Sequence, residues 1–437
     1  PMERFVMKKH KTTSLSIAVI TAAMLLAVTA CGQQSQQNVE AESQEQPDKN
    51  NHAVDPGDRE SQEASSPQPR LGITYDGGVA IVDGSTLETL SDFEAEGFLR
   101  INPAGDGRHM FLSEGESFRL LDAGTWAEPH GDHNHYYTAD PLLTGITIDG
   151  PEPGHVVAHE GNGALFFDGS GEIHTFELAQ LDAAAELDTE VAETAHPHHG
   201  VAVAFEDGSR FETLGDDQDR PGARVLSSDG DEVARNDDCP GVHGEATGPE
   251  GMIAVGCEDG ALVWDGEEFT KIAAGPDYAR TGNLCPAADS NIMLGDYNET
   301  TDEPMTQVAL IDVEAGKINT SEIGAAYNFR SLARGPEAEA LILAEDGQLH
   351  VLDPGTGKQL EAIQVIEEWT EPEEWQEPRP AIQVIDDVAY ITDPAQQAIH
   401  MVDLVNMEIL DSADLDFVPN ELTAVDGKPV AEHSHER

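Results

Sequence analysis

The chain has 437 residues and carries 84 Asp and Glu against 23 Lys and Arg, which gives a formal net charge of −61. A chain of this length can bury a substantial core. A charge this negative repels phosphates, so it excludes nucleic acids and anionic membrane surfaces as main partners and favours a cation or a protein.

The first 31 residues have the pattern of an export signal. Lysines near the N-terminus precede an apolar run from Ser16 to Val28, which is too short for an ordinary membrane-spanning helix. The run ends in the letters VTAC at Cys31 and resembles a bacterial lipobox, in which the cysteine is lipidated. We expect residues 1–31 to be a lipoprotein signal peptide, with Cys31 anchoring the mature, extracytoplasmic protein to the outer face of the cytoplasmic membrane.

Residues 32–69 are rich in Gln, Glu, Ser, Asn, Asp and Pro and contain hardly any large apolar residue. Such a segment cannot bury enough apolar surface to fold, so we expect a disordered acidic and polar tether. Residues 427–437 are expected to form a flexible C-terminal tail.

From Arg70 onwards, short alternating runs are separated by Asp-Gly and similar turns, which is typical of β-hairpins. Several segments repeat one unit, an apolar strand that ends in Asp-Gly, at a spacing of roughly 40 to 47 residues that is typical of propeller blades. We therefore predict an all-β fold, a single β-propeller over residues 70–426, with eight blades and seven as the alternative. Blades are expected to begin near residues 98, 155, 199, 243, 283, 330 and 380.

The two ends of this region complement each other. The segment from Leu71 to Asp92 lacks an inner strand, and the segment from Asn420 to Val425 is an orphan strand. Pairing of the N- and C-terminal strands would complete one blade and close the ring.

Two inserts interrupt the repeats. Residues 178–194 are expected to contain a helical turn. Residues 367–380 are acidic and contain Trp369 and Trp375, which we expect to pack against the propeller, with anchoring of a partner as the alternative.

Three cysteines lie in the propeller region. Cys239 precedes one expected inner strand and Cys257 lies in the next, and an exported protein is found in an oxidising compartment. We predict a disulfide between Cys239 and Cys257, which leaves Cys285 as a buried free thiol. A disulfide that includes Cys285, or a zinc-bound Cys285 thiolate, is the alternative.

Five histidines lie between positions 130 and 159. In an extended segment His133 and His135 point the same way about 6 to 7 Å apart, so both rings can reach one ion. His155 and His159 share a face but lie about 13 Å apart in a strand, so at most one of them joins that pair. A pH-sensitive surface is the alternative to a metal site.

Alignment of the repeats on their Asp-Gly ends places His159, His199 and His243 near the same turn of three consecutive blades. Equivalent positions of neighbouring blades converge around the channel, so the loop before the first of these blades could supply further ligands. Zinc fits such a site, because it is bound by neutral imidazoles and a carboxylate. The predicted zinc ligands are His130, Asp132, His133, His135, His155, His159, His199 and His243. For each histidine, a ring that only bonds the backbone of a turn is the alternative.

Three sequence runs carry a family resemblance: HGDHNHYY from His130 to Tyr137, PGHVVAH from Pro153 to His159, and GVHGE from Gly241 to Glu245. Together with the lipobox and the propeller pattern, they resemble the AztD-type zinc metallochaperones. The resemblance covers about residues 70 to 425 and is strongest over residues 128–260. It implies a protein that binds zinc outside the cytoplasm and passes it directly to the solute-binding protein of a zinc ABC transporter. The tether lacks a histidine-rich tract, which departs from the better-known members.

The sequence therefore predicts a zinc-binding protein that is not an enzyme and that contacts the membrane only through its lipid anchor. Two other classes remain as alternatives. One is a protein-interaction propeller without a metal. The other is a metal-dependent propeller hydrolase, in which Glu160 or Glu245 would serve as the general base.

Overall fold

The computed structural model describes residues 59–183, 186–248, 251–288, 290–301 and 303–429. The predicted signal peptide with Cys31, the tether up to residue 58 and the tail from residue 430 lie outside the described residues. Where the chain is described, no helix has the length and apolar character needed to cross a membrane.

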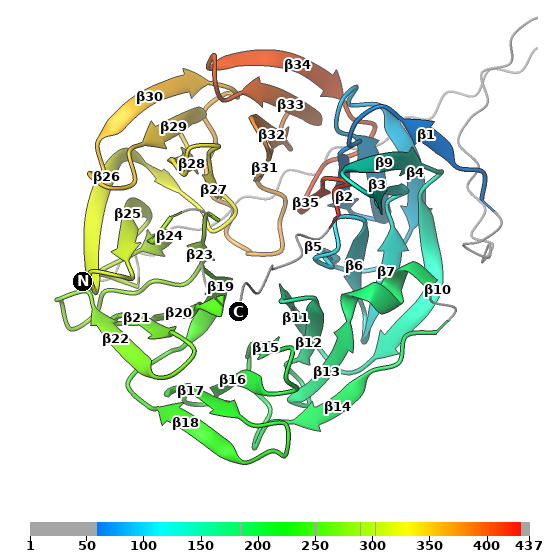
Figure 1. The fold of residues 1–437 in the computed structure, drawn as a ribbon. Coiled ribbons are helices and arrows are strands. Elements are labelled where there is room, and N and C mark those ends of the chain that lie inside the picture. The colour runs from blue at the N-terminus through cyan, green and yellow to red at the C-terminus, as the bar shows by residue number, and fades with distance from the viewer. Residues whose placement is uncertain (1–58, 184–185, 249–250, 289, 302, 430–437) are drawn as a thin grey trace, which may run out of the picture. The chain divides into compact units, whose positions relative to one another are not determined.

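In these ranges the chain forms eight four-stranded antiparallel sheets, which follow one another around a common centre (Figure 1). The strands of the first four sheets, given from the inner to the outer strand, are β35 (Leu422–Val425), β2 (Arg70–Tyr75), β3 (Gly78–Asp83) and β4 (Thr89–Glu94); β5 (Arg100–Pro103), β6 (His109–Glu114), β7 (Ser117–Asp122) and β10 (Leu142–Asp149); β11 (Pro153–His159), β12 (Asn162–Phe167), β13 (Glu172–Glu177) and β14 (Glu190–Glu193); and β15 (Ala202–Ala204), β16 (Arg210–Leu214), β17 (Gly222–Leu226) and β18 (Glu232–Asn236).

The other four sheets contain β19 (His243–Thr247), β20 (Ile253–Cys257), β21 (Gly260–Trp264) and β22 (Phe269–Ala273); β23 (Leu284–Cys285), β24 (Ile292–Tyr297), β25 (Met305–Asp312) and β26 (Lys317–Tyr327); β27 (Leu332–Arg334), β28 (Ala340–Leu343), β29 (Gln348–Leu352) and β30 (Gln359–Gln364); and β31 (Ile382–Ile385), β32 (Val388–Asp393), β33 (Ala398–Asp403) and β34 (Glu408–Asp414).

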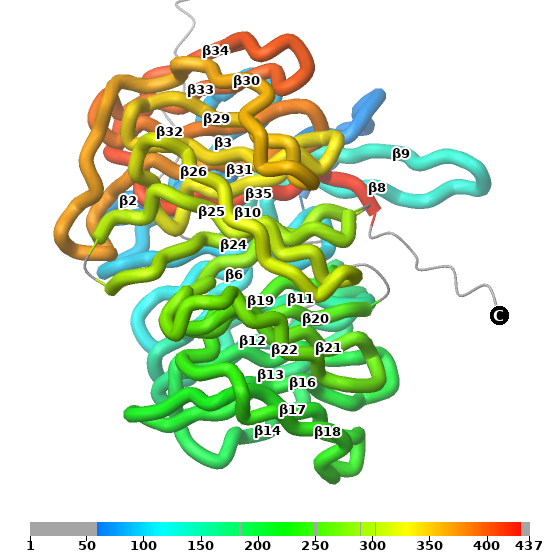
Figure 2. The backbone as a smooth tube through the Cα atoms, turned by 90° about the vertical axis from the view of Figure 1, so that its left-hand side faces the viewer, coloured from blue at the N-terminus to red at the C-terminus, as the bar shows by residue number. Residues whose placement is uncertain are grey.

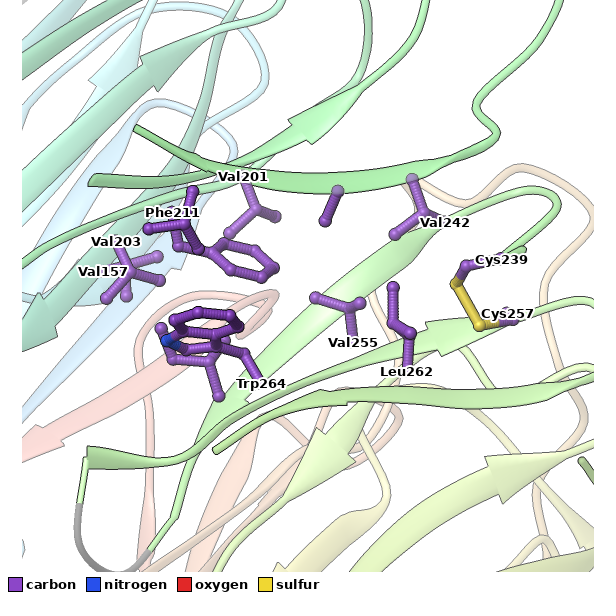
Figure 3. Packing of buried hydrophobic residues seen from close by; sticks show 13 residues of the cluster. Val157, Val201, Val203, Phe211, Cys239, Val242, Val255, Cys257, Leu262 and Trp264 are labelled. Carbon is purple, nitrogen blue, oxygen red and sulfur yellow. A yellow bond between two sulfur atoms is a disulfide. The ribbon is translucent and has the colours of Figure 1, made fainter. Parts of the chain in front are cut away.

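The core lies between neighbouring sheets. Two of the apolar runs that end in Asp-Gly form the second strands β20 and β28, whose residues are all buried because a sheet covers each face. The run before Gly208 instead contains the innermost strand β15, and the run before Gly84 forms the third strand β3. One core cluster joins β15 and β16 to β20 and β21, with Phe211 and Trp264 at one end and the Cys239–Cys257 disulfide at the other (Figure 3). The outer strands, such as β34, are mostly exposed and polar.

The predicted repeat boundaries are confirmed. Inner strands begin at residues 100, 153, 202, 243, 284, 332 and 382, each within three residues of its predicted position. The expected orphan strand is β35, which pairs with β2 in antiparallel register from Arg70 opposite Val425 to Ile73 opposite Leu422. One sheet therefore contains strands from both ends of the described chain.

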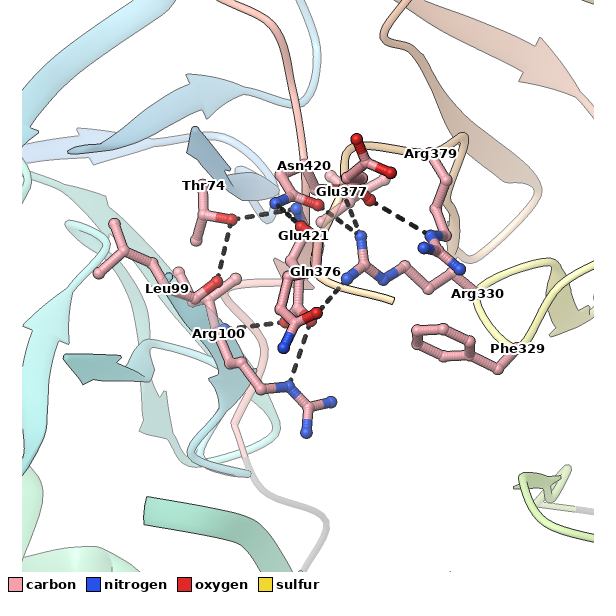
Figure 4. Close-up of polar contacts among 12 residues, drawn as sticks. Thr74, Leu99, Arg100, Phe329, Arg330, Gln376, Glu377, Arg379, Asn420 and Glu421 are labelled. Atoms are coloured by element: carbon pink, nitrogen blue, oxygen red, sulfur yellow. Dashed lines mark hydrogen bonds and ion pairs between the residues drawn. The ribbon is translucent and has the colours of Figure 1, made fainter. Parts of the chain in front are cut away.

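Glu421, next to β35, links the paired strands β35 and β2 to neighbouring segments of the chain (Figure 4). Its carboxylate accepts hydrogen bonds from Arg100 Nε at 3.2 Å, Arg330 Nη2 at 3.0 Å and the backbone N–H of Ile101 at 3.3 Å. Its own N–H donates to Thr74 Oγ1 at 3.0 Å. The carboxylate of Glu421 thus connects β35 with β5 and the segment before β27, and its backbone N–H adds a contact with β2.

A further sheet of three strands contains the hairpin of β8 (Thr125–His130) and β9 (His133–Thr138), which is inserted between β7 and β10, and β1 (Gln62–Ala64) from before β2. The expectation of a disordered tether as far as residue 69 is wrong for β1. The reason is that the edge of the β8–β9 hairpin offers unpaired backbone groups, and β1 pairs with them from Gln62 opposite Thr138 to Ala64 opposite Tyr136. The hairpin projects away from the neighbouring sheets (Figure 2).

The inserts and cysteines largely follow expectation. Residues 178–183 form the 3-10 helix η2 (Leu178–Ala183). Trp369 packs as predicted and its Nε1–H donates to Ala344 O at 2.9 Å, whereas Trp375 is 48% exposed and touches Phe98 edge-on. The predicted Cys239–Cys257 disulfide is present. Cys285 is a free thiol whose pKa burial raises to about 12.

Candidate metal site

Three histidines from consecutive sheets meet near the centre of the ring. His155 lies in β11, His199 in the segment before β15, and His243 begins β19. The ring centroids of His199 and His243 are 4.9 Å apart, and that of His155 lies 5.1 Å from His199 and 6.2 Å from His243. We call this group the inner trio.

The Nε2 atoms of His199 and His243 lie 3.0 Å apart. In a tetrahedral zinc site with Zn–N bonds of about 2.0 to 2.1 Å, two ligand nitrogens are about 3.3 to 3.4 Å apart. The observed spacing is close to that value. Two imidazole lone pairs at this distance repel each other unless a cation, either a proton or a metal ion, lies between them.

The other ring nitrogen of each histidine in the inner trio faces an acceptor. His155 Nδ1 lies 3.1 Å from Glu245 Oε2, His199 Nδ1 lies 2.5 Å from Asp168 Oδ2, and His243 Nδ1 lies 3.2 Å from the carbonyl oxygen of Gly282. Carboxylate and carbonyl oxygens accept, so each Nδ1 carries the proton. This pattern fixes the tautomer and leaves Nε2 as the metal-binding atom in the neutral ring.

Local backbone features bring these groups together. A Cβ on Gly154 would come within 2.4 Å of the Asp168 carboxylate, so only glycine leaves room for the partner of His199. Gly244 has a φ of +63°, and a Cβ there would come within 1.8 Å of Gly282 O. The strand register shifts between His243 and Glu245, which is typical of a β-bulge at a functional site.

The electrostatic environment keeps His243 neutral. Burial, followed by the positive charges that His155, His199 and Arg280 would carry, lowers its pKa to about 3. At neutral pH the ring is therefore unprotonated at Nε2 and ready to bind a cation. Metal binding does not have to displace a proton from this ring.

The inner trio is open to solvent through cavities. His155 and Glu245 line a cavity of about 360 Å³ that also contains Arg100 and Arg330. His199 and His243 line another of about 850 Å³. An ion held by the inner trio can thus be reached by an incoming ligand.

A second group of histidines lies on the β8–β9 hairpin. One ring nitrogen from each of His130, His133 and His135 lies within 4.8 Å of the others. His135 Nδ1 is 2.6 Å from Glu63 Oε1 of β1. Asp132, the predicted carboxylate ligand, is fully exposed, with its Oδ1 3.2 Å from His133 Nδ1. We call His130, His133 and His135 the hairpin trio.

The structure separates predicted ligands that the sequence placed together. Figures 1 and 2 both show the hairpin trio's strands apart from β11 and β19, so the loop does not join the strand histidines. His159 ends β11, where its ring packs edge-on against Phe205, and His155 takes the place beside His199 and His243 that was predicted for His159. Alignment of the repeats on their Asp-Gly turns therefore selected the wrong histidine of β11, four residues after the one that lies beside His199 and His243.

The sequence analysis did not predict the contacts of Asp168 and Gly282 with the site histidines. It considered Glu245 only as a general base and not as the partner of His155 Nδ1. Asp168 belongs to an Asp-Gly turn that the repeat analysis treated as a turn signal only. A usable signal was present, since glycine adjoins each histidine of the inner trio, at positions 154, 200 and 244.

Asp106, His109 and Asp182 also bring three potential ligand atoms within 4.8 Å of one another. This group belongs to an ion-pair network, because Asp122 accepts hydrogen bonds from both Arg59 and Arg108 and lies 3.8 Å from His109 Nε2. Burial alone would raise the pKa of Asp122, but the Arg108 hydrogen bond and the charges of His109, Arg108 and Arg59 hold it well below its usual value.

We expect Asp122→Asn to lower the free energy of unfolding by about 3 kcal/mol at pH 7, because two arginines would lose a buried partner. Because the folded pKa is lowered, the contribution of Asp122 is complete above the unfolded value of about 3.9 and is lost as the pH falls below it. The measurement is urea unfolding of both proteins at pH 7 and pH 3. The exposed Asp182→Asn is the matched control, and a pH-independent difference would contradict the assignment.

The chain is similar in sequence and in fold to a zinc chaperone. The chain is 25% identical over 370 residues to the zinc chaperone AztD of Citrobacter koseri, which covers 82% of this chain and 86% of that protein. The crystal structure of Citrobacter koseri AztD aligns with a TM-score of 0.74 at 23% identity, covering 83% of this chain and 98% of that chain. The apo form of that protein gives a TM-score of 0.73 at 22% identity. No family model matches. The resemblance predicted from the sequence is confirmed, and the structural alignments show the same fold.

Proposed function

We propose that this chain is a zinc chaperone of the AztD type, built as a closed eight-bladed β-propeller. It binds zinc at the inner trio and hands the ion to the solute-binding protein of a zinc ABC transporter. The observation that carries the proposal is the set of three Nδ1 contacts, to Glu245, Asp168 and Gly282 O. They leave Nε2 as the ligand atom of each ring, on three different sheets, and the Nε2 atoms of His199 and His243 already lie 3.0 Å apart.

Zinc leaves by ligand exchange, in which an acceptor ligand replaces one histidine at a time. The side chain of His199 is 38% exposed, whereas that of His155 is 18% exposed. We therefore expect His199 to be displaced first and the deeply placed His243 last. The hairpin trio can hold zinc as well, but its exposure favours weak and exchangeable binding.

The proposed role is not enzymatic. Glu245, one of the two carboxylates that a metal-dependent hydrolase would use as general base, is engaged by His155 Nδ1. Glu160 lies beside His159 at the other end of β11, with its Oε1 3.7 Å from His159 Nε2.

We also propose that the protein acts outside the cytoplasm, anchored to the membrane through a lipid on Cys31. The Cys239–Cys257 disulfide supports this placement, because disulfides persist in oxidising compartments.

The test is a zinc titration of the purified full-length protein against a chromophoric chelator, beside His133→Ala/His135→Ala. We expect tight binding of about one zinc ion that survives in the variant, since the inner trio keeps all its ligands. Loss of tight binding in the variant would show that the hairpin trio, and not the inner trio, is the tight zinc site. Absence of tight zinc binding in the wild type would overturn the proposed function.

Transfer is tested by mixing zinc-loaded protein with a metal-free zinc solute-binding protein. Direct handover predicts a rate that rises with acceptor concentration and exceeds the spontaneous release of zinc. A rate equal to spontaneous release at all acceptor concentrations would contradict it.

A further inference from the structure

Two arginines beside the inner trio lack the ion-pair partners that most other arginines have. In the described ranges, the arginines with a carboxylate oxygen within 3.2 Å are Arg59, Arg70, Arg100, Arg108, Arg119, Arg210, Arg224, Arg235, Arg330 and Arg379. Arg334 binds backbone carbonyl oxygens. Arg220 has no ion pair there, and Arg280 only reaches Asp296 at 4.0 Å.

Arg220 and Arg280 line the same cavity of about 850 Å³ as His199 and His243. Arg220 Nη1 lies 3.5 Å from the carbonyl oxygen of His199, and the Arg280 side chain is 32% exposed. Two like charges thus lie near each other, next to the proposed zinc ligands.

Five carboxylate residues line this cavity, and in the described residues none of them makes an ion pair with either guanidinium: Glu152, Asp168, Asp216, Asp217 and Asp219. Asp168 binds His199 Nδ1, and Asp216 accepts hydrogen bonds from the backbone N–H groups of Gln218 and Asp219. Asp217 and Asp219 also line the cavity and do not reach either guanidinium within ion-pair distance. In a chain with 84 acidic residues, the open guanidinium pair therefore indicates a place for an anion from outside.

We propose that Arg220 and Arg280 form a carboxylate-binding site for the molecule that accepts zinc from the inner trio. This inference rests on the proposed function. The planar guanidinium group matches a carboxylate with two parallel hydrogen bonds, and carboxylates are among the ligands by which acceptors hold zinc. A carboxylate docked here lies beside His199, the ligand expected to exchange first.

The test compares zinc transfer from the full-length protein to two small acceptors, a tetracarboxylate chelator and an uncharged pyridyl chelator. In Arg220→Gln/Arg280→Gln we expect transfer to the tetracarboxylate to slow about tenfold, with no slowing for the uncharged chelator, because only the first acceptor uses the arginines. The matched control is Arg119→Gln/Arg235→Gln, which removes the same charge elsewhere and should leave both rates unchanged. Equal slowing with both chelators, or with neither, would overturn the inference.

A second measurement needs no zinc, so it separates failure of this inference from failure of the proposed function. The zinc-free protein is melted in succinate and in potassium chloride of matched ionic strength. Succinate should raise the melting temperature of the wild type and of the control variant but not that of Arg220→Gln/Arg280→Gln. The same response in all three proteins would overturn the carboxylate site, even if zinc binding were found.

Discussion

Replacing His243 by alanine is expected to weaken zinc binding by more than about a hundredfold. Loss of an outer partner of a metal ligand usually costs 10- to 100-fold in affinity, and loss of the ligand itself should exceed that range. His243 is the ring whose Nε2 lies 3.0 Å from His199 Nε2 and whose pKa, lowered to about 3, keeps it neutral. The measurement is chelator competition at pH 7.

His174→Ala is the matched control for His243→Ala. His174 is also partly buried, with its Nδ1 3.0 Å from Thr189 Oγ1, but it lies in β13 outside both histidine trios. It should retain wild-type zinc affinity. If both variants bind zinc as the wild type does, the inner trio is not the zinc site.

Removal of the Cys239–Cys257 disulfide by a double serine substitution is expected to lower the free energy of unfolding by about 3 kcal/mol, because the unfolded chain regains the conformational entropy that a cross-linked loop of similar length lacks. The disulfide spans 18 residues and fixes the segment that leads into His243. Val242, directly before that ligand, lies next to the disulfide in the core (Figure 3) and its N–H donates to Arg220 O at 3.1 Å.

Because the disulfide positions His243, the same variant should also bind zinc on the order of tenfold more weakly. Urea unfolding gives the stability and chelator competition gives the affinity. Cys285→Ser is the control, since that thiol is unpaired and lies outside the inner trio. Lower stability with unchanged zinc affinity would show that the disulfide only stabilises the fold.

Much of the fold could be predicted from the sequence, because its signals are local. Apolar strands that end in Asp-Gly recur along the chain, so a single repeated pattern located the inner strands from Arg100 to Ile382 within three residues. The partner of β2 was predictable because a strand without a sheet remained at the other end. By contrast, β1 could not be found in a polar segment, because it pairs through backbone groups on an edge that the sequence does not reveal.

The candidate site was only partly predictable. His199 and His243 were correctly grouped, but the choice between His155 and His159 depends on which end of β11 faces the centre of the ring. Periodicity cannot decide this, because residues four apart in a strand point to the same face. Asp168 comes from a turn between two other strands, and its contact with His199 depends on packing between adjacent sheets.

The pairing of β2 with β35 affects how the chain folds during its synthesis. Residue 70 pairs with residue 425, so β2 has an open hydrogen-bonding edge until almost the whole chain has been synthesised. Exposed strand edges recruit other chains, and contacts this distant in sequence form slowly. The nascent chain therefore passes through a long aggregation-prone period, which ends only when its last strand docks.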